Sequence, residues 1–204
     1  MQIVKLNKNS TDATSKSYVN YWIDLDMECP ESIQWLKNES RLNEDLINIL
    51  IERNYSNRRR QYKHGTLINF CHTKQASSSD TIDINFLVED NRVITVHWGE
   101  IDAITKFNRM LKNEKEVTTC WGVLASVVSM LSDEMEDHTI EIGLETDKLE
   151  DQILESNSGL PMDELASLRR RLMRTRRYNK PIANLINNIS NDTRHSQNCW
   201  KPDE

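Results

Sequence analysis

Four side chains that could bind a metal ion recur at helical spacing in the middle of the sequence. They are Glu134, His138, Glu141 and Glu145. Steps of three and four residues bring side chains onto neighbouring rows of one helix face, so this spacing places an imidazole beside carboxylates. Such a ligand set suits Zn²⁺ or a similar divalent cation. We therefore predict a metal site formed by Glu134, His138 and Glu141, with Glu145 next in the row.

A second interpretation of His138 is structural. His138 also lies on the apolar stripe of its helix, where a histidine can pack in the core between ordinary surface carboxylates. Three ligands from one helix do not complete a tetrahedral shell, so water or a neighbouring subunit would have to supply the rest. The sequence requires no cofactor, and Zn²⁺ or another divalent cation is the ion that we expect at this site.

Signatures of common enzyme active sites are absent from the sequence. It contains no GxGxxG, GxxxxGK[ST], GxSxG or HExxH motif, and only 5 glycines are available for a phosphate-binding loop. We therefore expect no catalytic residues and no enzymatic activity.

Charge is distributed unevenly along a chain whose formal net charge is -6. Residues 133–155 are rich in Asp and Glu and contain Lys148 as their one basic residue, whereas residues 168–178, LRRRLMRTRRY, are rich in arginine. Arginine-rich helices can bind nucleic acid, but here the acidic segment offers an internal partner and Tyr178 is the one aromatic residue at hand for stacking. We predict ion pairing between the two segments and no nucleic-acid binding.

The elements that position these residues follow from hydrophobic periodicity. Residues 19–26 alternate as a half-buried strand does, and residues 65–74, 81–90 and 92–98 are rich in β-branched and aromatic residues. The last three predict an antiparallel meander. Helices are predicted after Pro30, at 42–53 and at 99–114.

Two long helices are predicted in the second half of the chain. Apolar residues recur in steps of three and four along 117–155, and again from Met162 to Ile189 with Leu165, Leu168 and Leu172 in the stripe. The short segment SNSGLP at 156–161 joins them, so the helices must lie antiparallel as a hairpin. Pro181 predicts a kink near Arg177.

Composition sets the cellular context that we expect. Hydrophobic residues make up 37% of the 204 residues, with no apolar run long enough to span a bilayer and no secretory signal pattern at the N-terminus. The 4 cysteines are far apart, which favours reduced thiols over disulfides. The chain is expected to be soluble.

Several segments together resemble the CorA-type divalent-cation transporters, and within them the ZntB-like zinc branch. The resemblance covers residues 18–191 and lies in YWIDLD (21–26), INFLVEDNRVITVHW (84–98), LEDQIL (149–154) and LRRRLMRTRRYNKPIANL (168–185). It implies an α+β fold, in which an α/β/α sandwich with a central mixed, largely antiparallel sheet precedes a long antiparallel helical hairpin. We expect an N-terminal subdomain at 1–116, the hairpin at 117–191, and at 192–204 the start of a connection towards the membrane.

The function implied by this resemblance is that of a cytoplasmic domain. In the family, two transmembrane helices with a Gly-Met-Asn motif between them follow this region, and neither feature occurs in the present sequence. The resemblance implies a homopentamer in the inner membrane, with this portion in the cytoplasm acting in funnel assembly and in ion sensing or gating. It contacts a membrane only through segments that this chain does not contain.

Two other functions are compatible with the sequence. A free-standing soluble helical-hairpin interaction module would need no transmembrane segment. A metal-dependent hydrolase would use a site around His138, and its activity would disappear on His138→Ala.

Overall fold

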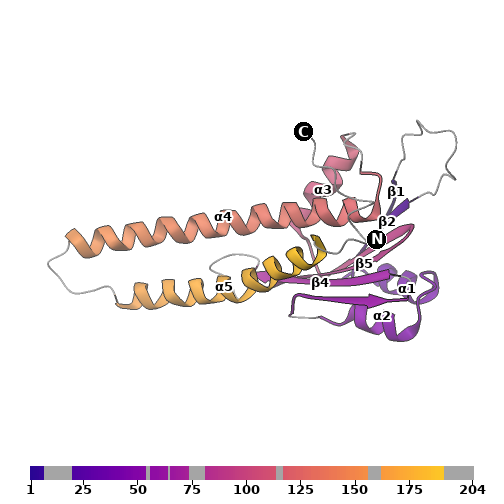
Figure 1. Cartoon of the computed structure of the whole chain (residues 1–204), viewed down its shortest axis with the longest axis horizontal. Coiled ribbons are helices and arrows are strands. Elements are labelled where there is room, and N and C mark those ends of the chain that lie inside the picture. Colours follow the sequence, from indigo (N-terminus) through magenta and orange to yellow (C-terminus); the bar gives the residue numbers. More distant parts are fainter. Residues whose placement is uncertain are drawn as a thin grey trace.

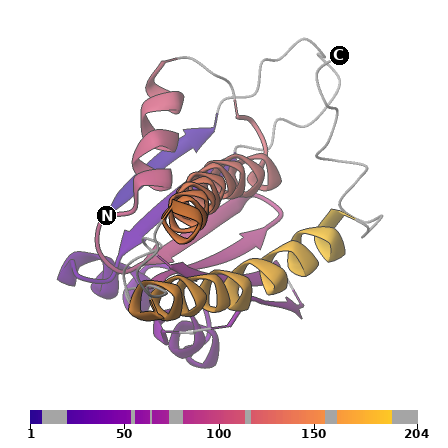
Figure 2. The same cartoon turned by 90° about the vertical axis from the view of Figure 1, so that its left-hand side faces the viewer.

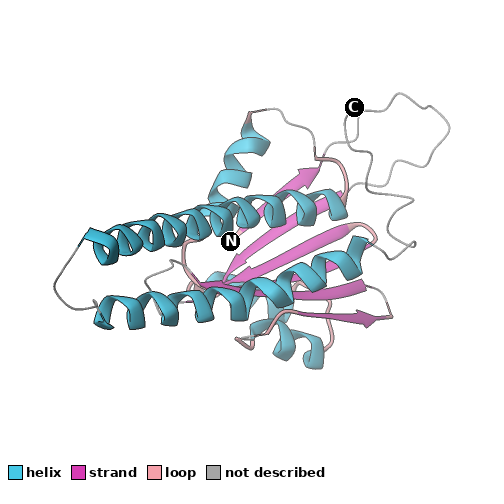
Figure 3. Ribbon diagram, turned by 60° about the vertical axis from the view of Figure 1, so that its left-hand side comes forward, coloured by secondary structure: helices cyan, strands magenta, loops and turns pink. Residues whose placement is uncertain are grey.

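The computed structural model describes residues 1–6, 20–53, 56–63, 65–73, 81–113, 117–155 and 162–190. A single sheet is covered by two short helices on one face and by three helices on the other, and two of these three form a hairpin that extends well beyond the sheet (Figures 1 and 3). The predicted α+β fold, with a mixed sheet between helices followed by a long helical hairpin, is confirmed.

The sheet has six strands in the order β1-β2-β6-β5-β4-β3. Their bounds are Gln2–Leu6 (β1), Asn20–Asp26 (β2), Arg58–Tyr62 (β3), Gly65–Thr73 (β4), Thr81–Glu89 (β5) and Arg92–His97 (β6). Among these strands β2 and β6 pair in parallel, and every other neighbouring pair is antiparallel. The sheet is therefore mixed and largely antiparallel, as expected.

The two edge strands, β1 and β3, were not predicted. β3 has the sequence RRRQY, which lacks the β-branched residues that mark a strand, and β1 is a short alternating segment at the chain terminus. Both are held by pairing with a longer neighbour, so a tertiary contact rather than a local pattern specifies them.

Five helices complete the described part of the chain. They are α1 (Pro30–Asn38), α2 (Glu44–Ile51), α3 (Asp102–Lys112), α4 (Cys120–Glu155) and α5 (Met162–Ser190). Pro30 occupies the first turn of α1, and the side chain of Asn43 caps α2 by accepting a 2.9 Å hydrogen bond from the amide of Leu46. The long helix α5 continues through Pro181.

Each face of the sheet has its own hydrophobic core. On one face Ile23, Leu67 and Ile94 pack against α1 and α2. On the other face Trp22 packs edge-on against Phe107 of α3, at 4.8 Å between ring centroids, and its indole donates a hydrogen bond to Thr95. This second core continues into α4 and α5, so the beginning of α4 and the end of α5 are anchored on the sheet (Figure 2).

The hairpin seam differs from the predicted stripe. Leu165 and Leu172 were expected to face α4 but are exposed, whereas Leu168 is buried with Ile142 and Leu149 of α4. The inward row of α5 continues through Arg171, so a charged residue occupies a position that an apolar residue was expected to fill. The predicted loop at 156–161 lies outside the described residues.

Three of the 4 cysteines lie in the described part of the chain. Cys71 and Cys120 are buried and Cys29 is half-buried, and the expected reduced thiols stay a prediction. Cys199 and the predicted connection at 192–204 lie outside the described residues. Residue 116, at which the first predicted subdomain ends, also lies outside them.

Candidate functional site

The acidic and basic segments meet on the hairpin at Arg171. Its guanidinium donates a hydrogen bond to the carboxylate of Glu145 and lies 3.6 Å from the carboxylate of Glu141. The hydrogen bond from Arg171 lowers the pKa of Glu145, and the same contact raises that of the guanidinium. The side chain of Arg171 is 13% exposed, so this contact lies within the seam rather than on a fully solvated surface.

Arg171 therefore forms one rung of the predicted ladder of ion pairs between the two helices. Arg169, Arg170, Arg176 and Arg177 are exposed and belong to other faces of α5. They give the outer surface of α5 its positive charge.

The predicted metal ligands have cationic neighbours. Glu134 lies 3.5 Å from the amine of Lys106 on α3, and Glu141 lies beside Arg171. Burial raises the pKa of Glu134, although the charge of Lys106 acts in the opposite direction. His138 is half-buried on the inner side of α4. No group of three or more His, Cys, Asp or Glu side chains in the described ranges is arranged to hold a metal ion. The site at Glu134, His138 and Glu141 stays a prediction, and a bound cation would have to displace Lys106 and Arg171.

His72 of β4 is a buried histidine that the sequence analysis did not single out. Its side chain is on the sheet face covered by α4 and α5, and within the described part of the chain neither ring nitrogen has a partner in hydrogen-bonding geometry. Burial lowers the pKa of His72 to about 4, the nearby backbone of Thr73 acts in the opposite direction, and a charge on His138 contributes a smaller further lowering. His72 is therefore neutral near pH 7 and lies close to His138.

A second pair of polar groups joins β2 to β6. Atom Nε2 of His97 is 3.3 Å from the carboxylate of Asp24, and Nδ1 is 2.8 Å from the carbonyl oxygen of Gly99. Burial lowers the pKa of His97, but the contacts with Asp24 and Gly99 outweigh burial and raise it overall. Both ring nitrogens face acceptors, so the doubly protonated imidazolium fits this environment.

Polar side chains also occupy the opposite face of the sheet, between β4 and β5. Asn69 donates a hydrogen bond to Asn85 at 2.6 Å, and Asn85 donates to the carbonyl of Leu50 at the end of α2. Two residues further along β4, burial raises the pKa of the Cys71 thiol, and the paired Asp83 raises it further. A thiol held protonated is a poor nucleophile, so this pair is structural.

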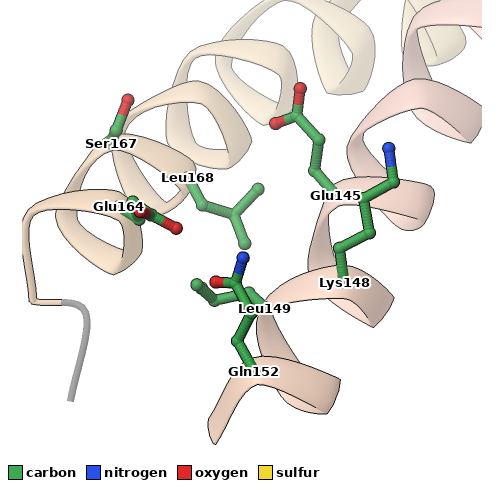
Figure 4. Close-up of a pocket in the computed structure, with 7 residues that line it drawn as sticks. All are labelled: Glu145, Lys148, Leu149, Gln152, Glu164, Ser167 and Leu168. Atoms are coloured by element: carbon green, nitrogen blue, oxygen red, sulfur yellow. The ribbon is translucent and has the colours of Figure 1, made fainter. Parts of the chain in front are cut away.

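A small pocket lies in the seam between α4 and α5, beyond the sheet (Figure 4). Its volume is about 260 Å³, and it is lined by Glu145, Lys148, Leu149, Gln152, Glu164, Ser167 and Leu168. Leu149 and Leu168 point towards one another in its floor (Figure 4). Acidic and basic side chains are mixed around an apolar floor, so these lining residues do not form a binding site for one ion or a catalytic site.

A family model described as "CorA-like Mg2+ transporter protein" matches residues 18–203. The chain belongs to this CorA-like family. The match includes strands β2 to β6 and helices α1 to α5, and so the whole described hairpin, which agrees with the resemblance found in the sequence. CorA-like proteins are transporters and not enzymes, so the expectation of a non-enzymatic protein is confirmed.

Curated relatives of this CorA-like chain are named zinc transport protein ZntB. The protein from Pectobacterium carotovorum is 25% identical over 174 residues, covering 84% of this chain and 53% of the relative. The protein from Yersinia pestis is 22% identical over 188 residues, covering 90% of this chain and 57% of the relative. The chain therefore spans about half the length of the curated relatives it matches.

Solved structures share the fold at low sequence identity. The full-length CmaX protein superposes with a TM-score of 0.80 at 18% identity, covering 94% of this chain and 63% of CmaX. The ZntB cytoplasmic domain from Vibrio parahaemolyticus gives a TM-score of 0.57 at 12% identity and covers 87% of this chain and 88% of that domain. The soluble domain of CorA from Methanocaldococcus jannaschii gives 0.63 at 15% identity, covering 85% of this chain and 71% of that domain.

Within the described ranges, no helix combines the length and the apolar composition that crossing a bilayer requires.

Proposed function

We propose that this chain is the cytoplasmic domain of a ZntB-like divalent metal cation transporter, and that zinc is the transported ion. The observation that carries this proposal is the family match over strands β2 to β6 and both long helices, together with curated relatives named for zinc transport. The whole protein would lie in the cell inner membrane, with this portion in the cytoplasm.

The role proposed for the domain is assembly and ion sensing. Charged helices near a pore set the local concentration of cations through their summed field. The acidic surface of α4 would attract divalent cations, and exposed side chains on both long helices would be available to neighbouring subunits of a homopentamer. Selection among zinc, magnesium and other ions would depend mainly on the ligands of the pore.

The metal site predicted on α4 would serve this sensing role. Glu134 and Glu141 now bind Lys106 and Arg171, so a cation at His138 would compete with two existing ion pairs. Occupation of the site would loosen the contacts of α4 with α3 and α5. This competition predicts modest affinity and a link between ion binding and the position of the hairpin.

A domain exchange tests the proposed function. The portion of the Pectobacterium carotovorum ZntB that matches this chain is replaced by this chain, and zinc uptake is measured in cells. A functional cytoplasmic domain of the same type restores uptake to within a few-fold of the parent transporter. A chimera that reaches the membrane and assembles, but takes up no zinc, contradicts the proposal.

A further inference from the structure

The outer face of α4, which points away from α5, carries a regular exposed stripe. Its members follow one another in steps of four and three residues and are Asp133, Asp137, Ile140, Leu144, Asp147 and Asp151. Ile140 and Leu144 are 54% and 57% exposed, which is unusual for two neighbouring large apolar side chains on one helix. The stripe is acidic with an apolar centre.

The outer face of α5 carries a matching stripe of opposite charge. Its exposed members follow the same spacing and are Met162, Ala166, Arg169, Met173, Arg176 and Lys180. Met173 is 59% exposed, and Leu172 beside it is 46% exposed. This stripe is basic with an apolar centre.

The two stripes lie on opposite sides of the hairpin. The inner faces of the helices are already occupied, because Ile142 and Leu149 pack on Leu168 and Arg171 binds Glu145. The helices lie side by side along their length (Figures 1 and 2). One side of the hairpin is therefore acidic and the other basic, and a single chain cannot bring its two stripes together.

The internal pairing of the hairpin shows how two copies would align. Arg171 of α5 lies at the same height along the hairpin as Glu141 and Glu145 of α4. This contact sets which residues of the two helices lie at equal heights. If a second hairpin lies alongside at the same level, Asp137 meets Arg176 and Asp133 meets Lys180. Ile140 then meets Met173, and Leu144 meets Arg169.

We propose that the outer stripe of α4 binds the outer stripe of α5 of a second copy of this chain. This inference rests on the proposed function, because it names the surfaces through which the cytoplasmic domains would associate. At this level two carboxylates face two basic side chains and Ile140 faces Met173, and this complementarity favours a second copy of this chain as the partner. Since the two surfaces differ, the contact is head-to-tail, and such contacts close into rings when the rotation between copies allows it.

Disulfide trapping between the stripes tests this contact in the full chain. Asp137→Cys and Arg176→Cys are combined in a background lacking Cys29 and Cys199; Cys71 and Cys120 are buried. Within one chain the two new cysteines lie on far sides of two packed helices, well beyond the ~7 Å Cα separation that a disulfide spans. Oxidation is therefore expected to produce a ladder of linked chains rather than an internal bridge.

Two controls make the trapping result specific. Asp137→Cys with Arg169→Cys moves one thiol seven residues, about 10 Å along the helix, and is expected to link at least tenfold more slowly. Each single-cysteine variant should give no linked dimer, because a head-to-tail contact does not bring identical positions together. Dimers from the single variants, or equal linking by both double variants, overturn the proposed contact.

Charge reversal supplies a second test that needs no cysteine. One variant carries Asp133→Lys and Asp137→Lys, and the other carries Arg176→Glu and Lys180→Glu. Each alone is expected to sediment as a monomer at concentrations where the parent chain associates, and an equimolar mixture should associate again, because every contact between the two variants pairs opposite charges. A parent chain that stays monomeric at every concentration, or variants that associate like the parent, contradict the inference.

The trapping and mixing tests can fail independently of the domain exchange that tests the proposed function. If the domain exchange restores zinc uptake while the trapping and mixing tests fail, the transporter function holds and the copies associate through other surfaces. If trapping succeeds and uptake fails, the head-to-tail contact holds and the proposed transport function is wrong.

Discussion

Arg171 of α5 crosses the hairpin seam and hydrogen-bonds Glu145 of α4, with Glu141 3.6 Å away on the same helix. This contact joins the basic and acidic helices and fixes which levels of the two lie opposite one another. It interrupts the apolar seam, because the buried residues of α5 on either side of it are Leu168 and Ile182.

Replacing Arg171 tests the importance of this contact. Arg171→Met keeps the side-chain stem but leaves Glu141 and Glu145 facing an apolar group, so the free energy of unfolding should fall by about 1 kcal/mol, between the values typical of exposed and buried pairs. Chemical denaturation at low and high salt measures it. Arg170→Met on the exposed surface is the matched control and should change stability by less than about 0.5 kcal/mol. Equal effects of the two substitutions would mean that Arg171 does not hold the seam.

His97 is expected to stabilise the fold at low rather than high pH. Its folded pKa is raised above the unfolded value of about 6.5, so its stabilisation is full below that value and is lost as pH rises through the folded pKa. Asp24→Asn removes the carboxylate and should cost about 2 kcal/mol below pH 6, with a smaller cost at alkaline pH. Urea denaturation over a pH series measures the difference, and a cost that does not change with pH would contradict a charged pair.

His72 is expected to act in the opposite direction. Its folded pKa of about 4 lies below the unfolded value, so the fold loses stability as pH falls from about 6.5 towards 4, by about 3 kcal/mol at the acid end. His72→Leu removes a buried imidazole without hydrogen-bond partners in the described chain, so this variant should be more stable than the parent by about 2 kcal/mol at pH 5. The same denaturation series decides, and a variant with the acid sensitivity of the parent would show that His72 is not the titrating group.

The sequence predicted the main elements because their patterns are local. The alternation of β2, β5 and β6 and the long apolar repeat of α4 depend only on neighbouring residues, and these elements are confirmed. β3 and the exposure of Leu165 and Leu172 depend on packing between distant segments. The spacing of the carboxylates around His138 was visible in the sequence, but their ion pairs with Lys106 and Arg171 were not, because these partners come from other helices. The position of His72 near His138 likewise depends on packing between distant segments.

Zinc binding at the predicted metal site remains open to a direct test. We expect modest binding at Glu134, His138 and Glu141 that weakens below about pH 6.5, because only the neutral imidazole coordinates a metal. Calorimetric titration of the chain and of His138→Ala measures it, and Lys106→Met should strengthen binding by freeing Glu134. Identical zinc isotherms for the chain and His138→Ala would remove this site.

We propose that this CorA-like chain acts as the cytoplasmic domain of a zinc transporter. The most direct measurement is the initial rate of zinc entry into lipid vesicles that contain the purified chimera with the Pectobacterium carotovorum ZntB, compared with vesicles that contain the parent transporter or no protein. We expect zinc entry within a few-fold of the parent rate. Entry at the rate of protein-free vesicles, with the chimera correctly inserted and oligomeric, would contradict the account.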